Sequence, residues 1–214
     1  MCSSDLEDRL RAVFTKLVGT VFFISSFLLI GLIPIAEALI LFLIGDKWLP
    51  SVPFLQILAV AGIMYPVGEI NLNILQVKGR ADYILRLQTI RKLITIPIII
   101  VGVYLGLMYL VAGIVLISFL DFFSSSYYSG RFIGFSTFQQ LGKALPYLII
   151  LTITASLTWV LGVYVSFLHS GIVLVLQGLF YFSLSVIAFE IFRLDAYIEV
   201  KGIVFSLLRK KTNR

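Results

Sequence analysis

The 214-residue chain is 60% hydrophobic, 14% aromatic and 13% charged. Soluble domains are under half apolar, so this composition excludes a soluble globular fold and indicates an integral membrane protein. The net charge of +6 is a topology signal rather than a sign of a nucleic-acid partner, because the Lys and Arg residues lie beside long apolar runs. A charge at the bilayer centre costs about 3 kcal/mol, so the charged residues mark the loops.

The first six residues, Met1 to Leu6 (MCSSDL), match the translation of the end of a common sequencing adapter. We expect residues 1–6 to be an artefact, which is excluded from fold reasoning, and the rest to be the C-terminal part of a longer protein. The alternative is a natural polar N-terminus that matches by coincidence. Cys2 is the only cysteine, so without it thiol and disulfide chemistry are absent.

Run lengths predict the membrane crossings, because a helical span needs about 20 apolar residues that rise about 1.5 Å each. Val13 to Ile33 is predicted as the first span, with Pro34 breaking or kinking it before a short apolar continuation over 35–44. Val52 to Gln76 is predicted as the second span.

The two remaining apolar stretches are each too long for one span. Tyr83 to Gly130 would extend about 72 Å as a single helix, so it is predicted to fold back around Gly102 to Gly106 into spans three and four. His169 and the Ser and Gly after it divide Pro146 to Arg193 into spans five and six. The sequence therefore predicts an all-α membrane protein of about six transmembrane helices.

Basic residues alternate between loops, as the positive-inside rule requires of an even number of spans with both ends in the cytoplasm. Lys47, beside Asp46, and His169 fall on the other side. Residues 194–208 mix apolar and charged residues before a basic end, so this tail is predicted to lie along the cytoplasmic membrane surface. The cytoplasmic set is Arg9, Arg11, Lys16, Lys78, Arg80, Arg86, Arg131, Lys143, Arg193, Lys201, Arg209, Lys210, Lys211 and Arg214.

Polar residues inside the spans are the candidate functional residues, because in a bilayer each needs a partner, a cavity or water. In the second span Glu69, Asn73 and Gln76 recur at helical spacing near the cytoplasmic end, and Gly62 and Pro66 extend that face outward. Gly and Pro interruptions free backbone groups, which is tolerated where a helix lines a cavity or packs on protein.

The third span carries Gln88, Arg91, Lys92 and Thr95 on one face, with Arg86 nearer the cytoplasm. One interpretation is capture of an anionic headgroup, with Arg91 offering the forked donor geometry that suits phosphate. The other interpretation is interfacial anchoring by long cationic side chains.

The fourth span carries Ser118, Asp121, Ser125 and Tyr128, with Asp121 the most deeply placed acid. Asp121 and Glu69 either carry protons for coupling or pair with nearby cations and fix the helix positions. The cations available for such pairs are Arg91, Lys92 and Arg80.

The stretch from Gly45 to Arg80 reads GDKWLPSVPFLQILAVAGIMYPVGEINLNILQVKGR, an apolar helix entered through Trp and two prolines and left through amides, a Lys and Gly-Arg. It resembles the matching segment of bacterial polysaccharide flippases of the Wzx type, in the multidrug/oligosaccharidyl-lipid/polysaccharide exporter superfamily. Ala36 with Glu37, and the basic approach over 9–16, also resemble that family. The chain after Gly130 matches it only in hydropathy.

This resemblance implies a two-lobed helical fold, shared with multidrug exporters of the MATE class and the lipid II flippase, that moves undecaprenyl-pyrophosphate-linked oligosaccharide across the bacterial inner membrane. Residues 7–130 would be the latter part of the second lobe with four spans, 131–193 two additional C-terminal spans, and 194–214 the cytoplasmic tail. The partners would be the N-terminal lobe of the same protein and membrane lipids, with no cofactor, metal or nucleic acid. The polar stripes would supply substrate-binding residues Arg91, Lys92, Gln88, Glu69, Asn73 and Gln76, and coupling residues Asp121 and Glu69.

Two other functions remain open. A MATE-type drug exporter shares the fold but prefers cationic substrates, so the cationic stripe argues against it while Glu69 and Asp121 argue for it. A polytopic polysaccharide polymerase or ligase resembles the chain in hydropathy but usually carries a long outer loop with catalytic residues, and no predicted outer loop here is long. The sequence has no paired carboxylates, His cluster, phosphate-binding glycine loop or nucleophile elbow, so the chain is predicted not to be an enzyme.

Overall fold

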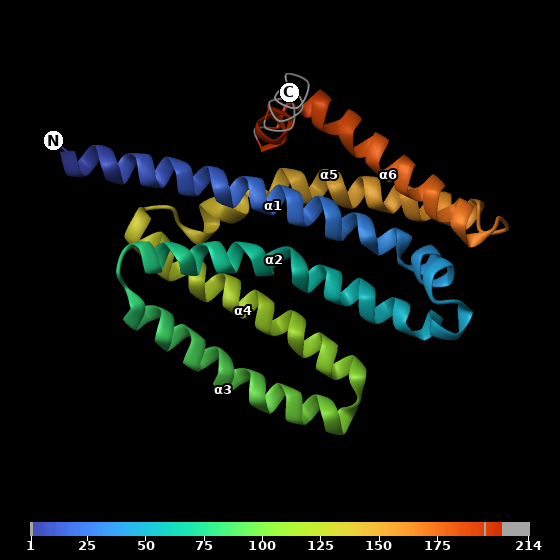
Figure 1. The fold of residues 1–214 in the computed structure, drawn as a ribbon, viewed down its shortest axis with the longest axis horizontal. Helices are drawn as coiled ribbons and strands as arrows, with labels where there is room; N and C mark the ends of the chain where they lie inside the picture. The colour runs from blue at the N-terminus through green and yellow to red at the C-terminus, as the bar shows by residue number, and fades with distance from the viewer. Residues whose placement is uncertain (1, 195, 203–214) are drawn as a thin grey trace, which may run out of the picture.

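The computed structural model describes residues 2–194 and 196–202. Within these ranges all the regular elements are helices, which confirms the predicted all-α membrane fold. In chain order the elements are α1 (Cys2–Leu43), the short 3-10 helix η1 (Asp46–Ser51), α2 (Val52–Val77), α3 (Ala81–Leu105), α4 (Leu107–Ile133), α5 (Thr137–Tyr164) and α6 (Ser170–Phe192) (Figure 1).

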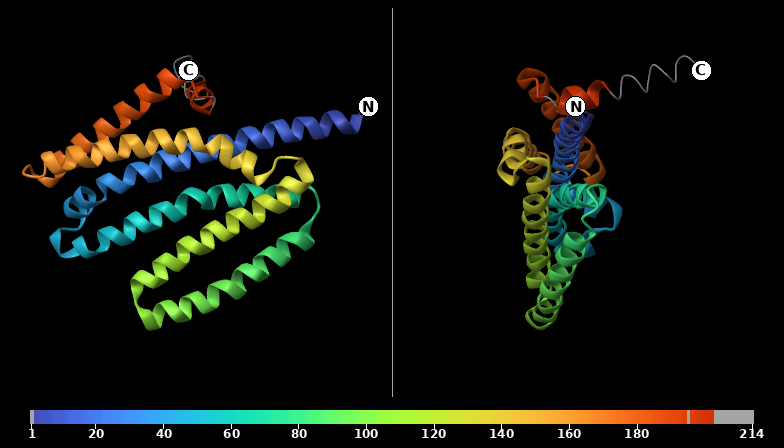
Figure 2. Two further views of the ribbon diagram at one scale, coloured as in Figure 1. Left: turned by 180° about the vertical axis from the view of Figure 1, so that it is seen from behind. Right: turned by 90° about the vertical axis from the view of Figure 1, so that its left-hand side faces the viewer.

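Consecutive α-helices run in opposite directions, so the chain passes back and forth along a slab of helices (Figure 1). α1 packs against α2 on one side and against α5 and α6 on the other. α4 packs on α2, and α3 packs mainly on α4 at the edge of the slab farthest from α6 (Figure 2). Since Gly102 is the only buried residue of α3, most of that helix surface is exposed.

In the part of the chain that the structure describes, five helices are long and apolar enough to cross a membrane: α1, α2 together with η1, α4, α5 and α6. α3 is not among the five, although it occupies the position of the predicted third span. Its first half carries Asp82, Arg86, Arg91 and Lys92, whereas residues 93–105 have no charge. Charges at membrane depth need partner groups or a cavity, so α3 depends on its neighbours more than the other helices do.

Pro34 does not break the first span. α1 continues through Pro34 to Leu43, and its ribbon bends near this end (Figure 1). A proline removes one helical hydrogen bond and kinks the axis, so of the two predicted outcomes the kink is observed. The Gln177 side-chain amide on α6 donates to the Pro34 carbonyl at 3.3 Å, which ties the bent end of α1 to α6.

The predicted fold-back at Gly102 to Gly106 is confirmed. Gly106 alone separates α3 from α4, with a φ of 110° that favours glycine. A Cβ atom on Gly102 would lie 2.7 Å from Cα of Leu110, so the two helices approach closely beside the turn. The predicted division at His169 is also confirmed, because Nδ1 of His169 accepts a hydrogen bond from the Gly171 N–H at 3.3 Å and caps α6.

The turns at the two ends of the slab differ in charge. The start of α1 and the turns at 78–80 and 134–136 lie at one end, while η1, Gly106 and the turn at 165–169 lie at the other (Figure 1). Most of the predicted cytoplasmic Lys and Arg residues therefore gather towards the first end, which we call the basic end. This is the arrangement that the alternating loops predict.

Residues 196–202 are helical and fold back onto the bundle. The Ala196 N–H donates to the Tyr147 hydroxyl on α5 at 3.0 Å, and the Tyr197 ring lies 5.6 Å from the Phe189 ring on α6. Glu199 forms a 3.2 Å ion pair with Lys16 of α1. This part of the predicted surface tail is thus packed against three helices, while Asp195 and residues 203–214 lie outside the described residues.

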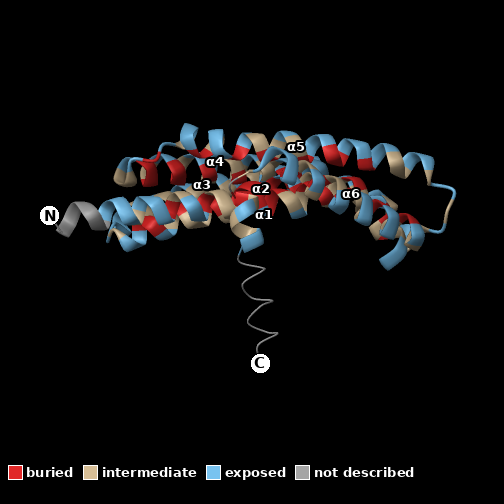
Figure 3. Ribbon diagram, turned by 90° about the horizontal axis from the view of Figure 1, so that it is seen from above, coloured by how far each residue is buried: buried red, intermediate tan, exposed pale blue. Residues whose placement is uncertain are grey.

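Buried residues, coloured red, lie mainly where the helices face one another, and exposed residues lie on the outer sides of the ribbons (Figure 3). Phe22 and Phe122 meet edge to face there, with ring centroids 5.8 Å apart, and both are almost fully buried. The outward faces carry many exposed Leu, Ile, Val and Phe side chains. Apolar exposure on this scale indicates a surface covered by lipid or by another part of a membrane protein.

Candidate functional site

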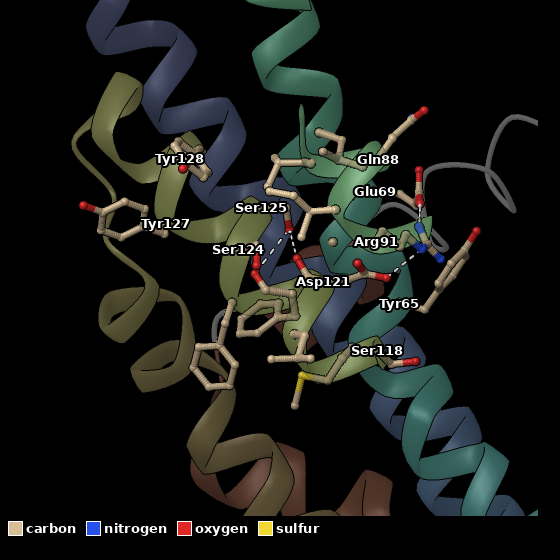
Figure 4. Close-up of a pocket in the computed structure, with 18 of the residues that line it drawn as sticks. Tyr65, Glu69, Gln88, Arg91, Ser118, Asp121, Ser124, Ser125, Tyr127 and Tyr128 are labelled. Atoms are coloured by element: carbon tan, nitrogen blue, oxygen red, sulfur yellow. Dashed lines mark hydrogen bonds and ion pairs between the residues drawn. The ribbon is translucent and has the colours of Figure 1, made fainter. Parts of the chain in front are cut away.

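A cavity of about 380 Å³ lies between α2, α3 and α4 (Figure 4). Its walls combine apolar side chains with polar groups from all three helices, which is the usual make-up of a small-molecule site. The polar lining consists of Tyr65, Glu69, Gln88, Arg91, Ser118, Asp121, Ser124, Ser125, Tyr127 and Tyr128.

Arg91 is the charged centre of this cavity. Its Nε lies 2.8 Å from Oδ2 of Asp121 on α4, and its Nη1 lies 3.7 Å from Oε1 of Glu69 on α2. The guanidinium also lies over the Tyr65 ring, 5.7 Å from the centroid (Figure 4). One cation from α3 is therefore shared by two acids from two other helices, and it links all three elements.

The three charges are only partly shielded. The Arg91 side chain is 33% exposed, Asp121 26% and Glu69 43%. Among the described residues Oδ2 of Asp121 accepts no directed hydrogen bond, so its contact with Arg91 is an electrostatic pair. Two carboxylates against one guanidinium leave an excess of negative charge at this point of the cavity.

Of the alternatives left open for the two acids, pairing with Arg91 is the one that the geometry shows. Arg80 instead lies over the Phe132 ring, 5.1 Å from its centroid. Lys92 makes no ion pair within the described part of the chain. It lines a second, shallower cavity of about 540 Å³ on α3, together with Gln88, Arg91 and Thr95.

Only part of the predicted stripe on α2 lies in the cavity wall. Glu69 lines the cavity, whereas Asn73 and Gln76 are exposed and line neither this cavity nor the one beside Lys92. The α2 residues that do line it include Gly68 and Leu72. Leu72 is the last α2 residue that lines the cavity, so Asn73 and Gln76 lie beyond the end of its wall along the helix, although their spacing places them on the same face as Glu69.

The predicted stripe on α4 lies in the cavity wall as a whole. Asp121, Ser118, Ser125 and Tyr128 all line it, and Gln88 joins them from α3. The Ser125 hydroxyl donates to the Asp121 carbonyl at 2.7 Å, so that serine mainly satisfies its own helix. Groups of three or more His, Cys, Asp or Glu suited to a metal ion are absent from the described residues.

A second polar cluster lies between α2, α4 and α5, and the spacing of residues in the sequence does not predict it. Asn71 on α2 and Gln140 on α5 are fully buried and exchange two side-chain hydrogen bonds, each 3.1 Å long. The buried Ser129 hydroxyl on α4 also donates to Oδ1 of Asn71. An amide inside an apolar run was the available signal, but the three partners lie on different helices and share no periodicity.

Three curated proteins are similar to parts of this chain. The teichuronic acid biosynthesis protein TuaB of Bacillus subtilis (strain 168) is 38% identical over 73 residues, 34% of this chain. The lipopolysaccharide biosynthesis protein WzxC of Escherichia coli (strain K12) is 31% identical over 98 residues, 46% of the chain. An uncharacterized membrane protein in the cps region of Klebsiella pneumoniae is 34% identical over 95 residues, 44% of the chain.

The chain is related to polysaccharide-biosynthesis membrane proteins. Its resemblance to the Wzx type is confirmed by these similarities. The matches cover 15% of TuaB and 20% of each of the other two proteins, so the chain matches only a small part of their length. No family model and no solved structure matches the chain.

Proposed function

We propose that the chain is part of a Wzx-type flippase, which moves undecaprenyl-pyrophosphate-linked oligosaccharide across the bacterial inner membrane for surface-polysaccharide assembly. The observation that carries the proposal is the charged cavity inside the helical bundle, with Arg91 held between two acids. The similarity to WzxC, a lipopolysaccharide biosynthesis protein, supports the same function. A planar guanidinium in the wall suits the two phosphates of the headgroup.

In this role the headgroup would compete for Arg91 with the carboxylates of Glu69 and Asp121, which already lie beside it. A pyrophosphate carries more negative charge than one carboxylate and competes for the same N–H donors. Lys92, on the adjoining face of α3, adds a second cation. Protonation of Asp121 or Glu69 would weaken that acid's hold on Arg91, and by this exchange the two acids would couple proton binding to capture of the headgroup.

The same proposal implies an orientation in the membrane and a partner for the chain. The basic end of the slab would face the cytoplasm, because positive residues concentrate on that side of bacterial membrane proteins. Alternating access requires two lobes that move against each other, so the partner of this chain would be the N-terminal lobe of the same protein. The chain would act as a transporter component and not as an enzyme.

One observation favours a second candidate, a MATE-type drug exporter. Around Arg91 the acids outnumber the cation, and a cavity with excess negative charge attracts cationic substrates. The polymerase or ligase has no such support, because the turns away from the basic end are short: 44–51 with η1, Gly106 and 165–169.

The test is transport by the full-length protein that contains this segment. Arg91→Gln combined with Lys92→Gln is expected to reduce delivery of lipid-linked oligosaccharide to the outer leaflet roughly tenfold to a hundredfold, because charge-assisted hydrogen bonds to phosphate are lost. The measurement is lectin labelling of the glycan in sealed vesicles, with protein amount and oligomeric state matched to the wild type.

The matched control removes two cations that line neither cavity, Arg86→Gln with Arg131→Gln, and should transport normally. Unchanged transport in the Arg91 and Lys92 double variant would refute the assigned role. The exporter is the correct function if oligosaccharide transport does not depend on this protein at all and the double variant exports cationic dyes.

In the same assay, Asp121→Asn should flatten the dependence of transport on external pH.

A further inference from the structure

A groove at the basic end lies outside the cavity around Arg91. Two adjoining hollows of about 580 and 380 Å³ share Thr15, Lys16, Lys143 and Glu199 in their walls. These walls come from the first turns of α5, the early part of α1 and residues 193, 194, 196, 198 and 199. We call this pair of hollows the tail groove.

The charges of the tail groove do not cancel. Both oxygens of Glu199 are engaged on α1, because Oε1 pairs with Lys16 at 3.2 Å and Oε2 accepts the Thr20 hydroxyl at 3.2 Å. Glu199 and Lys16 therefore neutralise each other. The other charged lining residues that the structure describes are three cations and one acid, which are Arg11, Lys143, Arg193 and Asp8.

The groove also has an apolar side and enough room for a headgroup. Ala12, Pro146 and Leu194 line it, and Leu17 and Leu145 are exposed on the neighbouring turns of α1 and α5. The smaller hollow exceeds tenfold the roughly 30 Å³ that a water molecule occupies in the liquid. A phosphate with its glycerol therefore fits, with apolar surface beside it for acyl chains.

We propose that the tail groove binds the phosphodiester headgroup of an anionic phospholipid of the surrounding membrane. Lys143 and Arg193 contact the phosphate, and the acyl chains run along Leu17 and Leu145 towards the bilayer centre. Basic pockets between membrane helices at this level recognise anionic lipids through charge and hydrogen bonds. The bound lipid bridges α1, α5 and the C-terminal helical residues, and this role does not rest on the proposed flippase function.

The test is lipid titration of the purified 214-residue chain, followed by native mass spectrometry from a neutral detergent. Dioleoylphosphatidylglycerol is expected to bind at least about tenfold more tightly than dioleoylphosphatidylcholine. Lys143→Gln with Arg193→Gln should weaken phosphatidylglycerol binding roughly tenfold to thirtyfold, since each cation near a membrane surface strengthens the binding of an anionic lipid about threefold to fivefold by electrostatic attraction. The charge-retaining pair Lys143→Arg with Arg193→Lys should bind like the wild type.

The control pair Arg86→Gln and Arg131→Gln lies at the same end but outside the groove, and it should keep full affinity. Equal affinity for the two lipids, or an equal loss in the control pair, would overturn the proposal. So would displacement of phosphatidylglycerol by inorganic phosphate at equal concentration, because the site would then belong to a soluble anion. If the double variant loses its helical circular dichroism, the ratio of the two lipid affinities in Lys143→Gln alone decides.

Discussion

Asn71 and Asn73 lie two positions apart on α2 and have opposite environments. Asn71 is fully buried and bonded to Gln140 and Ser129, whereas Asn73 is exposed. Among apolar helices a buried amide is costly unless every polar atom finds a partner. The network around Asn71 therefore fixes how α5 sits on α2 and α4.

Asn71→Ala is expected to lower the free energy of unfolding by about 1 to 3 kcal/mol, because it removes the two bonds that the buried amide of Gln140 makes with Asn71. Unfolding in mixed micelles, followed by circular dichroism, measures this. Asn73→Ala is the matched control and should change stability by less than about 0.5 kcal/mol. Equal effects of the two substitutions would show that the network does not hold the helices.

The sequence predicts which residues of the site are functional candidates but does not predict which of them pair. Arg91, Lys92, Glu69 and Asp121 were predicted because charges inside an apolar span are costly and are retained for a partner or a cavity. Which of them pair was not predictable, since that depends on how α2, α3 and α4 are rotated against each other. Sequence spacing places residues on a face of one helix but carries no information about the neighbouring helix.

The α3 and α4 hairpin is the element whose sequence signal and structure agree best. A run of apolar residues too long for one span has to turn, and the glycines at 102 and 106 mark where it does so. Gly106 supplies the positive φ, and Gly102 lets α3 approach Leu110. Because α3 packs almost entirely on α4, this contact positions Arg91 next to Asp121.

Gly102→Ala is expected to destabilise the hairpin by about 1 to 3 kcal/mol, because its Cβ would lie 2.7 Å from the Leu110 backbone and a helix has to shift. A fall in the melting temperature in detergent, read from the loss of monodisperse protein on heating, measures this effect. The control is Gly178→Ala on α6, where no atom lies within 4 Å of the added Cβ. Alanine there should leave stability unchanged or raise it by up to about 1 kcal/mol. A stable Gly102→Ala protein would contradict the close contact.

The slab as a whole has two chemically different ends. Basic turns gather at one end, and the three turns at the other carry few charges. If the positive-inside rule decides the orientation, the two ends lie in different compartments. Phe138 and Phe167 sit at opposite ends and are 84% and 81% exposed, so they offer matched positions for a probe.

In a background with Cys2→Ser, a membrane-impermeant maleimide applied to whole cells is expected to label Phe167→Cys and to spare Phe138→Cys. The reason is that residue 167 lies at the end with few charges, which should face the cell exterior. Permeabilised cells should label both positions and so serve as the control. The reverse pattern would invert the proposed orientation, and with it the direction in which the cavity at Arg91 receives a headgroup.

The sequence by itself determined the helical class, the places of the six α-helices that the structure describes, the hairpin at Gly106 and the gathering of basic turns at one end. These features follow from local quantities: the length of an apolar run, the conformational freedom of glycine and the cost of a charge in lipid. Only the tertiary structure decided that Arg91 is shared by Glu69 and Asp121, that Asn73 and Gln76 lie outside the cavity, and that Asn71 joins Gln140. Those outcomes depend on the rotation and packing of separate helices, since in a membrane side-chain fit and interhelical hydrogen bonds set both.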